Sequence, residues 1–219
     1  RGGLRRRPPR AAGRPSVAET WRANARLWSS ARRRYVYLAL WVPNGLIVGV
    51  EALYVPYRPD AAGLLFAFGA LGMLVGDVLA ARVLPARWRE RLAVPLCVLL
   101  AAPYLGFAVE PALPVAVVLV TVATCGYASG LLLQERLLAL TPGESSGQAL
   151  GLHSSGMLAW QGVGAAVAGG LAELTTAATA MAVTAVASLA VTALLAPGLR
   201  SERPSVSVSL LPSAQSEQS

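Results

Sequence analysis

The chain has 219 residues, of which 55% are hydrophobic and only 14% are charged, whereas an ordinary soluble domain is about a quarter charged. This excess of apolar side chains excludes a soluble globular domain, because no soluble interior of this size would bury it. All nineteen basic residues behind the net charge of +8 are arginine, and the absence of lysine excludes enzymes that depend on a Walker A, Schiff-base or kinase lysine.

Residues 1–34 are predicted to form a basic cytoplasmic loop between two domains, ending in an amphipathic surface helix. Eleven arginines precede Tyr35 in this segment. A transit peptide is the alternative, since it is also arginine-rich and poor in acidic residues, and Glu19 is the one acidic residue here. Nucleic acid is not an expected partner, because the arginines lie beside predicted membrane spans, where anionic lipid headgroups attract them.

Residues 35–197 are predicted to be an all-α transmembrane domain of six helices, because six apolar blocks follow one another. Each block has about the 17–25 residues that a helix needs to cross a bilayer, and helices satisfy their own backbone hydrogen bonds where no water is present. Both cysteines, Cys97 and Cys125, fall inside these blocks, so we expect no disulfide framework, no metal site and no cofactor. The blocks are Tyr35–Pro56, Ala61–Val83, Leu92–Val109, Leu113–Gln134, Leu150–Leu171 and Ala177–Ala196.

The loop arginines predict that both ends of this domain lie on the cytoplasmic side of the membrane. If the first span starts inside, Arg58 is the one loop arginine outside, where the loops instead carry Asp60, Glu110 and Glu173. The serine-rich residues 198–219 then form a disordered cytoplasmic tail. Arginine and alanine in place of lysine indicate a bacterium, and hence a plasma membrane. The remaining arginines on the inner side are Arg82, Arg87, Arg89, Arg91, Arg136, Arg200 and Arg203.

The first span carries an acidic residue, Glu51, within its apolar sequence. A carboxylate in a span costs several kcal/mol unless it faces protein or water, so Glu51 is a candidate functional residue. The alternative is that it lies in the outer third of the span and reaches the surface. Pro43 and Gly45 are expected to loosen the same helix. The polar and aromatic side chains that share one face of this span are Tyr37, Trp41, Asn44, Glu51 and Tyr54.

The fourth span carries a second polar stripe, which leads to Glu135 and Arg136 at the inner boundary. Threonines in spans commonly bond to their own backbone, which is the alternative to a role in a cavity. The members of this stripe are Thr121, Thr124, Tyr127 and Gln134.

The fifth span is rich in small residues that predict close packing against a neighbouring helix. The small-xxx-small spacing is formed by Gly162, Ala166 and Gly170, with Ala165 and Gly169 beside them. Trp160 and Gln161 are the larger side chains there that could reach a ligand.

An intramembrane serine protease is the enzyme alternative, because such proteases also have six spans. Ser129 lies in the fourth span, and His153 is the one histidine of the chain. The rhomboid pattern Gly-x-Ser-Gly would need a glycine where Tyr127 stands, and His153 lies at the start of a helix. We therefore expect no catalytic residues and no enzyme activity.

The segment Gly72–Leu92, GMLVGDVLAARVLPARWRERL, resembles the glycine, aspartate and arginine loop motif of the major facilitator superfamily (MFS). The segment Leu140–Gly156, LTPGESSGQALGLHSSG, resembles the proline-to-glycine loop and Ala-x-Gly-Leu helix start of the same family. Met73 stands where the first motif has glycine, and Ser146 where the second often has arginine. Six spans after a long basic loop complete a resemblance to the carboxy-terminal half of these transporters, over residues 35–197.

In that family the first and fourth helices of each half line a central cavity, so the resemblance implies that both polar stripes face it. Glu51 would then exchange a coupling proton or pair with a cationic substrate. The resemblance also implies a charge latch on the inner face that breaks and reforms as the halves rock. The residues expected in this latch are Asp77, Arg82, Arg87, Arg89, Arg91, Glu135 and Arg136.

These observations together predict a secondary active transporter of a small molecule, of which this chain is the carboxy-terminal half. Its expected partners are the lipid bilayer, a small-molecule substrate, protons and an amino-terminal six-helix half. The alternatives are a stand-alone protein with six spans, either a rhomboid-like protease or a non-catalytic membrane scaffold. A scaffold needs no polar stripe, and two stripes on separate helices argue against it.

Overall fold

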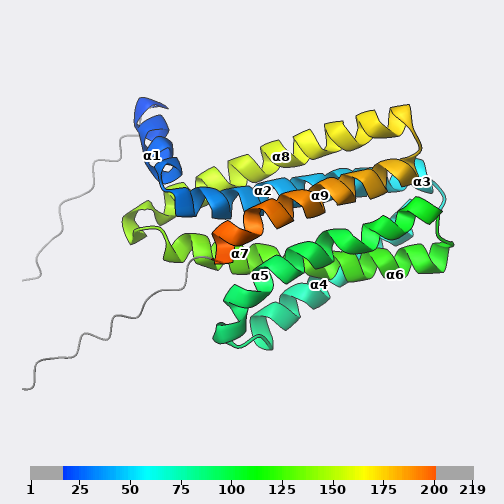
Figure 1. The fold of residues 1–219 in the computed structure, drawn as a ribbon, viewed down its shortest axis with the longest axis horizontal. Helices are drawn as coiled ribbons and strands as arrows, with labels where there is room; N and C mark the ends of the chain where they lie inside the picture. The colour runs from blue at the N-terminus through cyan, green and yellow to red at the C-terminus, as the bar shows by residue number, and fades with distance from the viewer. Residues whose placement is uncertain (1–16, 201–219) are drawn as a thin grey trace, which may run out of the picture.

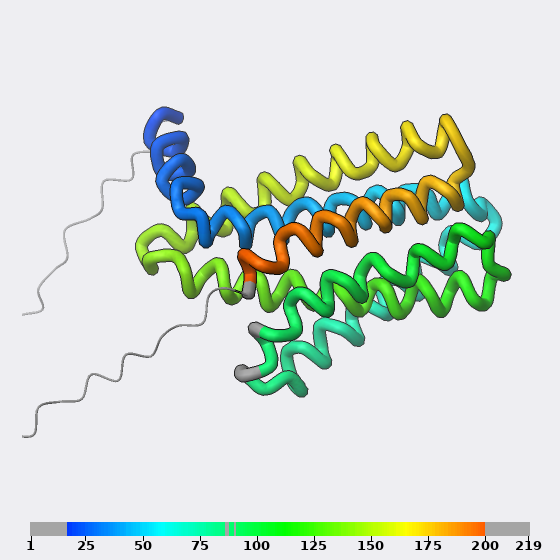
Figure 2. The backbone as a smooth tube through the Cα atoms, viewed as in Figure 1, coloured from blue at the N-terminus to red at the C-terminus, as the bar shows by residue number. Residues whose placement is uncertain are grey.

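The computed structural model describes residues 17–200, except for the side chains of Ala86, Arg87, Glu90 and Arg200, and this part of the chain is helical with no strand. Figures 1 and 2 show long helices that run back and forth between the two ends of one bundle. The all-α prediction is therefore confirmed for the described residues. Residues 1–16 and the predicted tail from residue 201 onward lie outside them.

The helices begin and end close to the predicted boundaries. The predicted surface helix is α1, and the turn expected between the fourth and fifth spans separates α7 from α8. In chain order the α-helices are α1 (Val17–Ser29), α2 (Ala31–Ala52), α3 (Tyr54–Tyr57), α4 (Ala62–Arg82), α5 (Ala86–Ala101), α6 (Leu113–Thr124), α7 (Ala128–Ala139), α8 (Ser146–Leu174) and α9 (Ala177–Arg200). The 3-10 helices are η1 (Ala102–Val109), η2 (Cys125–Tyr127) and η3 (Gly143–Ser145).

Five helical stretches in the described residues are long and apolar enough to cross a membrane. They correspond to the first, second, third, fourth and sixth predicted spans. The fifth, α8, is long enough at 29 residues but is not among them. Glycines, Gln161 and the run His153–Ser155 take the place of larger apolar side chains in α8. The five stretches are Ala31–Tyr57, Ala62–Arg82, Arg91–Val109, Leu113–Ala139 and Ala177–Leu199.

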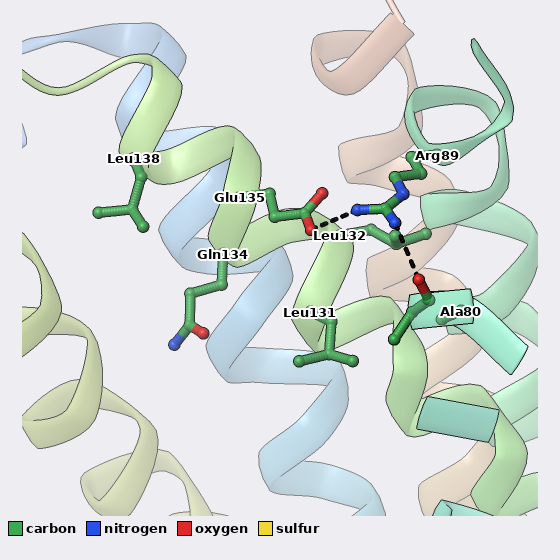
Figure 3. Close-up of a pocket in the computed structure, with 8 residues that line it drawn as sticks. Ala80, Arg89, Leu131, Leu132, Gln134, Glu135 and Leu138 are labelled. Carbon is green, nitrogen blue, oxygen red and sulfur yellow. Dashed lines mark hydrogen bonds and ion pairs between the residues drawn. The ribbon is translucent and has the colours of Figure 1, made fainter. Parts of the chain in front are cut away.

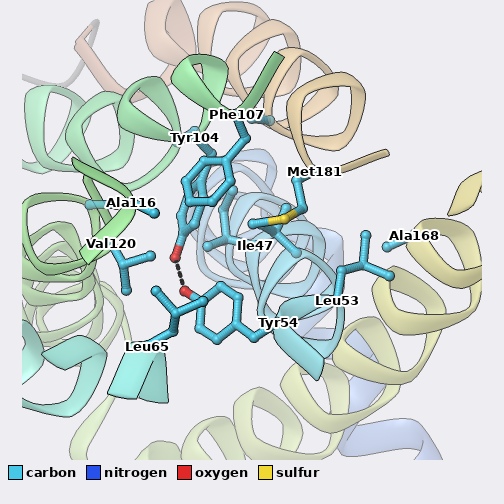
Figure 4. Close-up of a cluster of buried hydrophobic side chains, with 14 of the residues drawn as sticks. Ile47, Leu53, Tyr54, Leu65, Tyr104, Phe107, Ala116, Val120, Ala168 and Met181 are labelled. Atoms are coloured by element: carbon cyan, nitrogen blue, oxygen red, sulfur yellow. Dashed lines mark hydrogen bonds between the residues drawn. The ribbon is translucent and has the colours of Figure 1, made fainter. Parts of the chain in front are cut away.

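The helices pack in two groups that meet along α9 and α5. One group is α2 with α8 and α9, and the other is α4 with α6, η2 and α7, while η1 and α5 pack on α9. A buried apolar cluster joins the groups near one end of the bundle, with Tyr104, Phe107 and Met181 in its middle (Figure 4). A second cluster lies near the other end, around Val36, Leu133 and Leu137.

Helices α2 and α8 approach so closely that glycine is required at their contact. A Cβ added to Gly49 would collide with the backbone of Gly164, and one added to Gly164 would collide with the backbone of Gly45. The predicted small-residue stripe is not this contact, because Gly162 and Gly170 face open space. That prediction was wrong about the face, since α8 is rotated to place Gly164 against α2.

The first span is not interrupted at Pro43 or Gly45, where the sequence predicted a loosened helix. Helix α2 is continuous through Pro43 and Gly45, and the interruption comes at Leu53, two residues after Glu51. The fourth span tightens into a 3-10 turn at η2, which ends at Tyr127. A 3-10 turn inside a longer helix often marks a functional position.

Candidate functional site

A hydrogen bond joins the two spans predicted to carry polar stripes. The Tyr127 hydroxyl, at the end of η2, donates to Glu51 Oε1 on α2 at 2.8 Å. Both side chains are half-buried. A carboxylate with one strong donor is less costly to keep in an apolar setting, but it still has lone pairs free to accept a proton or a cation.

A tyrosine pair lies behind this carboxylate, in the apolar interior. The hydroxyls of Tyr54, on α3, and Tyr104, in η1, are hydrogen-bonded to each other (Figure 4). Both rings are buried, and the Tyr54 ring also packs against Phe66 of α4. Tyr54 was predicted to line a cavity, and the structure places it in the core instead, because α3 turns its ring toward α4 and η1.

A second polar contact links α2 with α8. The Gln161 side-chain amide donates to Asn44 Oδ1 at 3.3 Å, and both side chains are half-buried. Asn44 lies seven residues before Glu51, which puts the two on the same side of α2. The structure therefore brings together Gln161, Asn44, Glu51 and Tyr127 along one side of α2, with contributions from three spans.

Tyr37 and Trp41, the other aromatic members of the first stripe, are used in packing. The Tyr37 hydroxyl donates to the Ala149 carbonyl at 3.3 Å, and Trp41 Nε1 donates to the His153 carbonyl at 3.0 Å. Both rings are buried, and both stack with Trp28 of α1. Tyr37 and Trp41 therefore pack α2 against α1 and α8, and they do not line a cavity as predicted.

The two threonines of the second stripe bond to their own helix, as the alternative interpretation held. Thr121 donates to the Val117 carbonyl at 2.7 Å, and Thr124 donates to the Val120 carbonyl at 3.0 Å. Both lie against Gly72 of α4, where an added Cβ would collide with them. Threonine and glycine at this contact let α4 and α6 approach closely.

At the end of the bundle where α4 and α7 finish, an ion pair connects the first turn of α5 to α7. Arg89 Nη1 and Glu135 Oε1 are 2.6 Å apart, and Arg89 also donates to the carbonyls of Ala81 and Leu84 at 3.3 Å each (Figure 3). A hollow of about 310 Å³ lies beside this pair, with Gln134 in its lining. Arg89 therefore ties the carboxyl-terminal end of α4 to α7.

Three other residues of the predicted latch, Asp77, Arg82 and Arg91, form no ion pair with Arg89 or Glu135 in the described part of the chain. Asp77 is half-buried on α4, and Arg82 and Arg91 are exposed. Arg136 is half-buried in the last turn of α7. The side chain of Arg87 lies outside the described residues.

Three residues near the site were missed by the sequence analysis. Thr184, Ser188 and Thr192 recur every fourth residue on α9 and are all buried. Ser188 donates to the Pro43 carbonyl on α2 at 3.3 Å. Their spacing was visible in the sequence and would have identified one polar face of the last span.

The possible protease residues are not joined by a hydrogen bond in the described residues. Ser129 is buried beside the Cys97 thiol, whereas His153 is buried on α8 with Nδ1 unpartnered there. Comparison with known proteins gives no further information about function, since no protein-family model, curated protein or solved structure matches the chain.

Proposed function

We propose that this chain is the carboxy-terminal half of a proton-coupled transporter of the MFS type, with α8 as the fifth of its six membrane spans. The arginine distribution supports placing both ends of the six spans in the cytoplasm. A second six-helix unit would complete the cavity wall on the side of α2 where Asn44 and Glu51 lie.

The observation that carries this proposal is the hydrogen bond from Tyr127 to Glu51. It joins the first and fourth spans through a half-buried carboxylate, and a scaffold would gain nothing from that group, because a buried charge is expensive to keep. The short Leu53 break and η2 flank this contact on its two helices.

Glu51 acts in this proposal as the exchange point between a proton and a positively charged substrate. In the loaded state, the carboxylate is ionised, accepts the Tyr127 hydrogen bond and pairs with the substrate cation. When the substrate leaves, a proton replaces it on the carboxylate, so the site stays neutral within the membrane. Either charge-compensated form avoids the cost of a lone ion in an apolar setting.

The test uses proteoliposomes containing the whole natural protein, an imposed pH gradient and a panel of organic cations that includes ethidium and tetraphenylphosphonium. Glu51→Gln keeps the size and hydrogen-bonding ability of the side chain but removes its charge. We expect it to abolish gradient-driven uptake, a loss of about 100-fold or more, of the kind seen when a group that carries a proton in a reaction is removed.

Glu173→Gln is the matched control, because Glu173 is an exposed acid at the far end of α8. It should transport at the rate of the unchanged protein. Normal proton-driven uptake by Glu51→Gln would show that Glu51 carries neither the proton nor the substrate, and the proposed function would then fail.

A further inference from the structure

Helix α1 has an apolar side that the rest of the described chain leaves exposed toward its amino-terminal end. Val17 is 88% exposed, Trp21 is 76% exposed and Trp28 is 36% exposed. At the helical repeat these three residues fall on one side of α1, whereas Arg22 and Arg26 fall on another. Exposed tryptophans on one side and arginines on another are typical of a helix that lies in a membrane interface.

The position of α1 matches such a role. Figure 1 shows α1 at one end of the bundle, steeply inclined to the long helices and projecting past α8. Since the long helices cross the membrane, α1 lies close to the membrane plane. The bundle end at which it lies is the one where α4 ends, α5 begins and α7 ends, which is the end that carries the loop arginines.

The contacts at the carboxyl-terminal half of α1 hold it in this orientation. The Arg33 guanidinium donates to the carbonyls of Arg26 and Leu27 at 3.0 Å each, and to the Leu140 carbonyl at 3.3 Å. Trp28 stacks on Trp41 with ring centres 5.7 Å apart. The helix therefore holds its exposed side in place before any partner binds, which lowers the entropy cost of binding.

A hollow of about 310 Å³ lies between α1 and the second turn of α8. Its lining is Trp21, Asn24, Ala25, Trp28 and Leu152, and Asn24 is already engaged by the Gln148 side chain. The lining is therefore almost entirely apolar where it is open.

We propose that this hollow and the exposed arginines of α1 form a binding site for an anionic phospholipid. An acyl chain lies against Trp21, Trp28 and Leu152, and the headgroup phosphate meets Arg22 and Arg26, which are both exposed. Exposed Arg32 and Arg34, in the first turn of α2, add to the positive charge at the same level. This charge favours an anionic lipid over a second protein segment, because an apolar segment would leave the arginines unpaired.

The test measures retention of phosphatidylglycerol by the purified full-length protein in mixed phosphatidylglycerol and phosphatidylcholine micelles, using native mass spectrometry. We expect preferential retention of the anionic lipid. The double variant Arg22→Gln/Arg26→Gln should bind it about fivefold more weakly for each arginine removed. Its control, Arg82→Gln/Arg91→Gln, removes the same charge from exposed positions on other helices and should retain the lipid.

A second measurement locates the acyl chain by tryptophan fluorescence with phosphatidylglycerol brominated on its chains. We expect the lipid to quench the fluorescence of the unchanged protein. This quenching should fall in Trp21→Phe and persist in Trp88→Phe, since Trp88 is an exposed tryptophan on α5.

Equal losses of lipid binding in both arginine variants, or no preference for the anionic lipid, would overturn the proposal. The proposal would also be overturned if brominated lipid did not quench the fluorescence of Trp21, because a protein segment would then cover this side chain. None of these readouts depends on transport, so this proposal and the proposed function fail separately.

Discussion

At the scale of single residues, the polar side chains of the bundle divide into two kinds by their partners. Glu51, Asn44 and Gln161 are half-buried and paired across helices through groups that keep spare donor or acceptor capacity. Tyr54 and Tyr104 are buried and satisfy each other. The first kind can exchange partners with a ligand, whereas the second stabilises the core, so only the first belongs to the candidate site.

The tyrosine pair gives a prediction about stability. Tyr104→Phe leaves the Tyr54 hydroxyl buried without a partner, so we expect it to lower the free energy of unfolding by about 1–3 kcal/mol. The double variant Tyr54→Phe/Tyr104→Phe removes both hydroxyls and should recover most of that loss. Thermal unfolding of the purified protein in one detergent provides the measurement. If the double variant lost as much free energy of unfolding as the two single variants together, the two hydroxyls would act independently.

At the scale of elements, the contact between α2 and α8 organises the site. Helix α8 is less apolar than the other long helices, yet it contributes Gln161 to the polar side of α2 and backbone surface at Gly164 to the closest approach. Van der Waals packing at small residues holds membrane helices together, because lipid supplies no hydrophobic force between them. The glycines therefore decide how far Gln161 stands from Asn44.

This packing predicts opposite outcomes at two glycines of one helix. Gly164→Ala forces α8 away from α2, because its Cβ collides with the backbone at Gly45, and we expect a loss of about 1–3 kcal/mol of stability. Gly162→Ala has open space and should be neutral or stabilise by up to about 1 kcal/mol, since alanine favours a helix. Thermal unfolding in detergent distinguishes the two. Equal behaviour of both variants would show that α2 and α8 are not in close contact.

At the scale of the whole molecule, the described chain exposes large apolar faces. Leu64, Phe66, Leu71 and Leu74 are exposed on α4, and Leu158 and Val163 on α8. Lipid covers such faces around the outside of a membrane bundle.

A second six-helix unit is expected if the proposed function holds. The native protein would be isolated from membranes with an antibody to the sequence SERPSVSVSLLPSAQSEQS, and its intact mass would be measured by mass spectrometry. We expect a mass near twice the 22.7 kDa of this chain, or a one-to-one complex with a second membrane protein. A lone species of 22.7 kDa would contradict the half-transporter proposal and bring back the protease and scaffold alternatives.

The sequence by itself determined the all-α class, the position of most of the long apolar helices, the helix before Tyr35 and the candidate carboxylate at Glu51. These follow from composition, block length and charge, which are local properties of the chain. Only the tertiary structure decided which polar residues meet. It paired Glu51 with Tyr127, turned Tyr54 into the core and Thr121 against α4, and used Gly164 in place of the predicted stripe. A repeat of polar residues defines a side of a helix, but the rotation of each helix against its neighbours depends on packing across the whole bundle, and this rotation decides what that side faces.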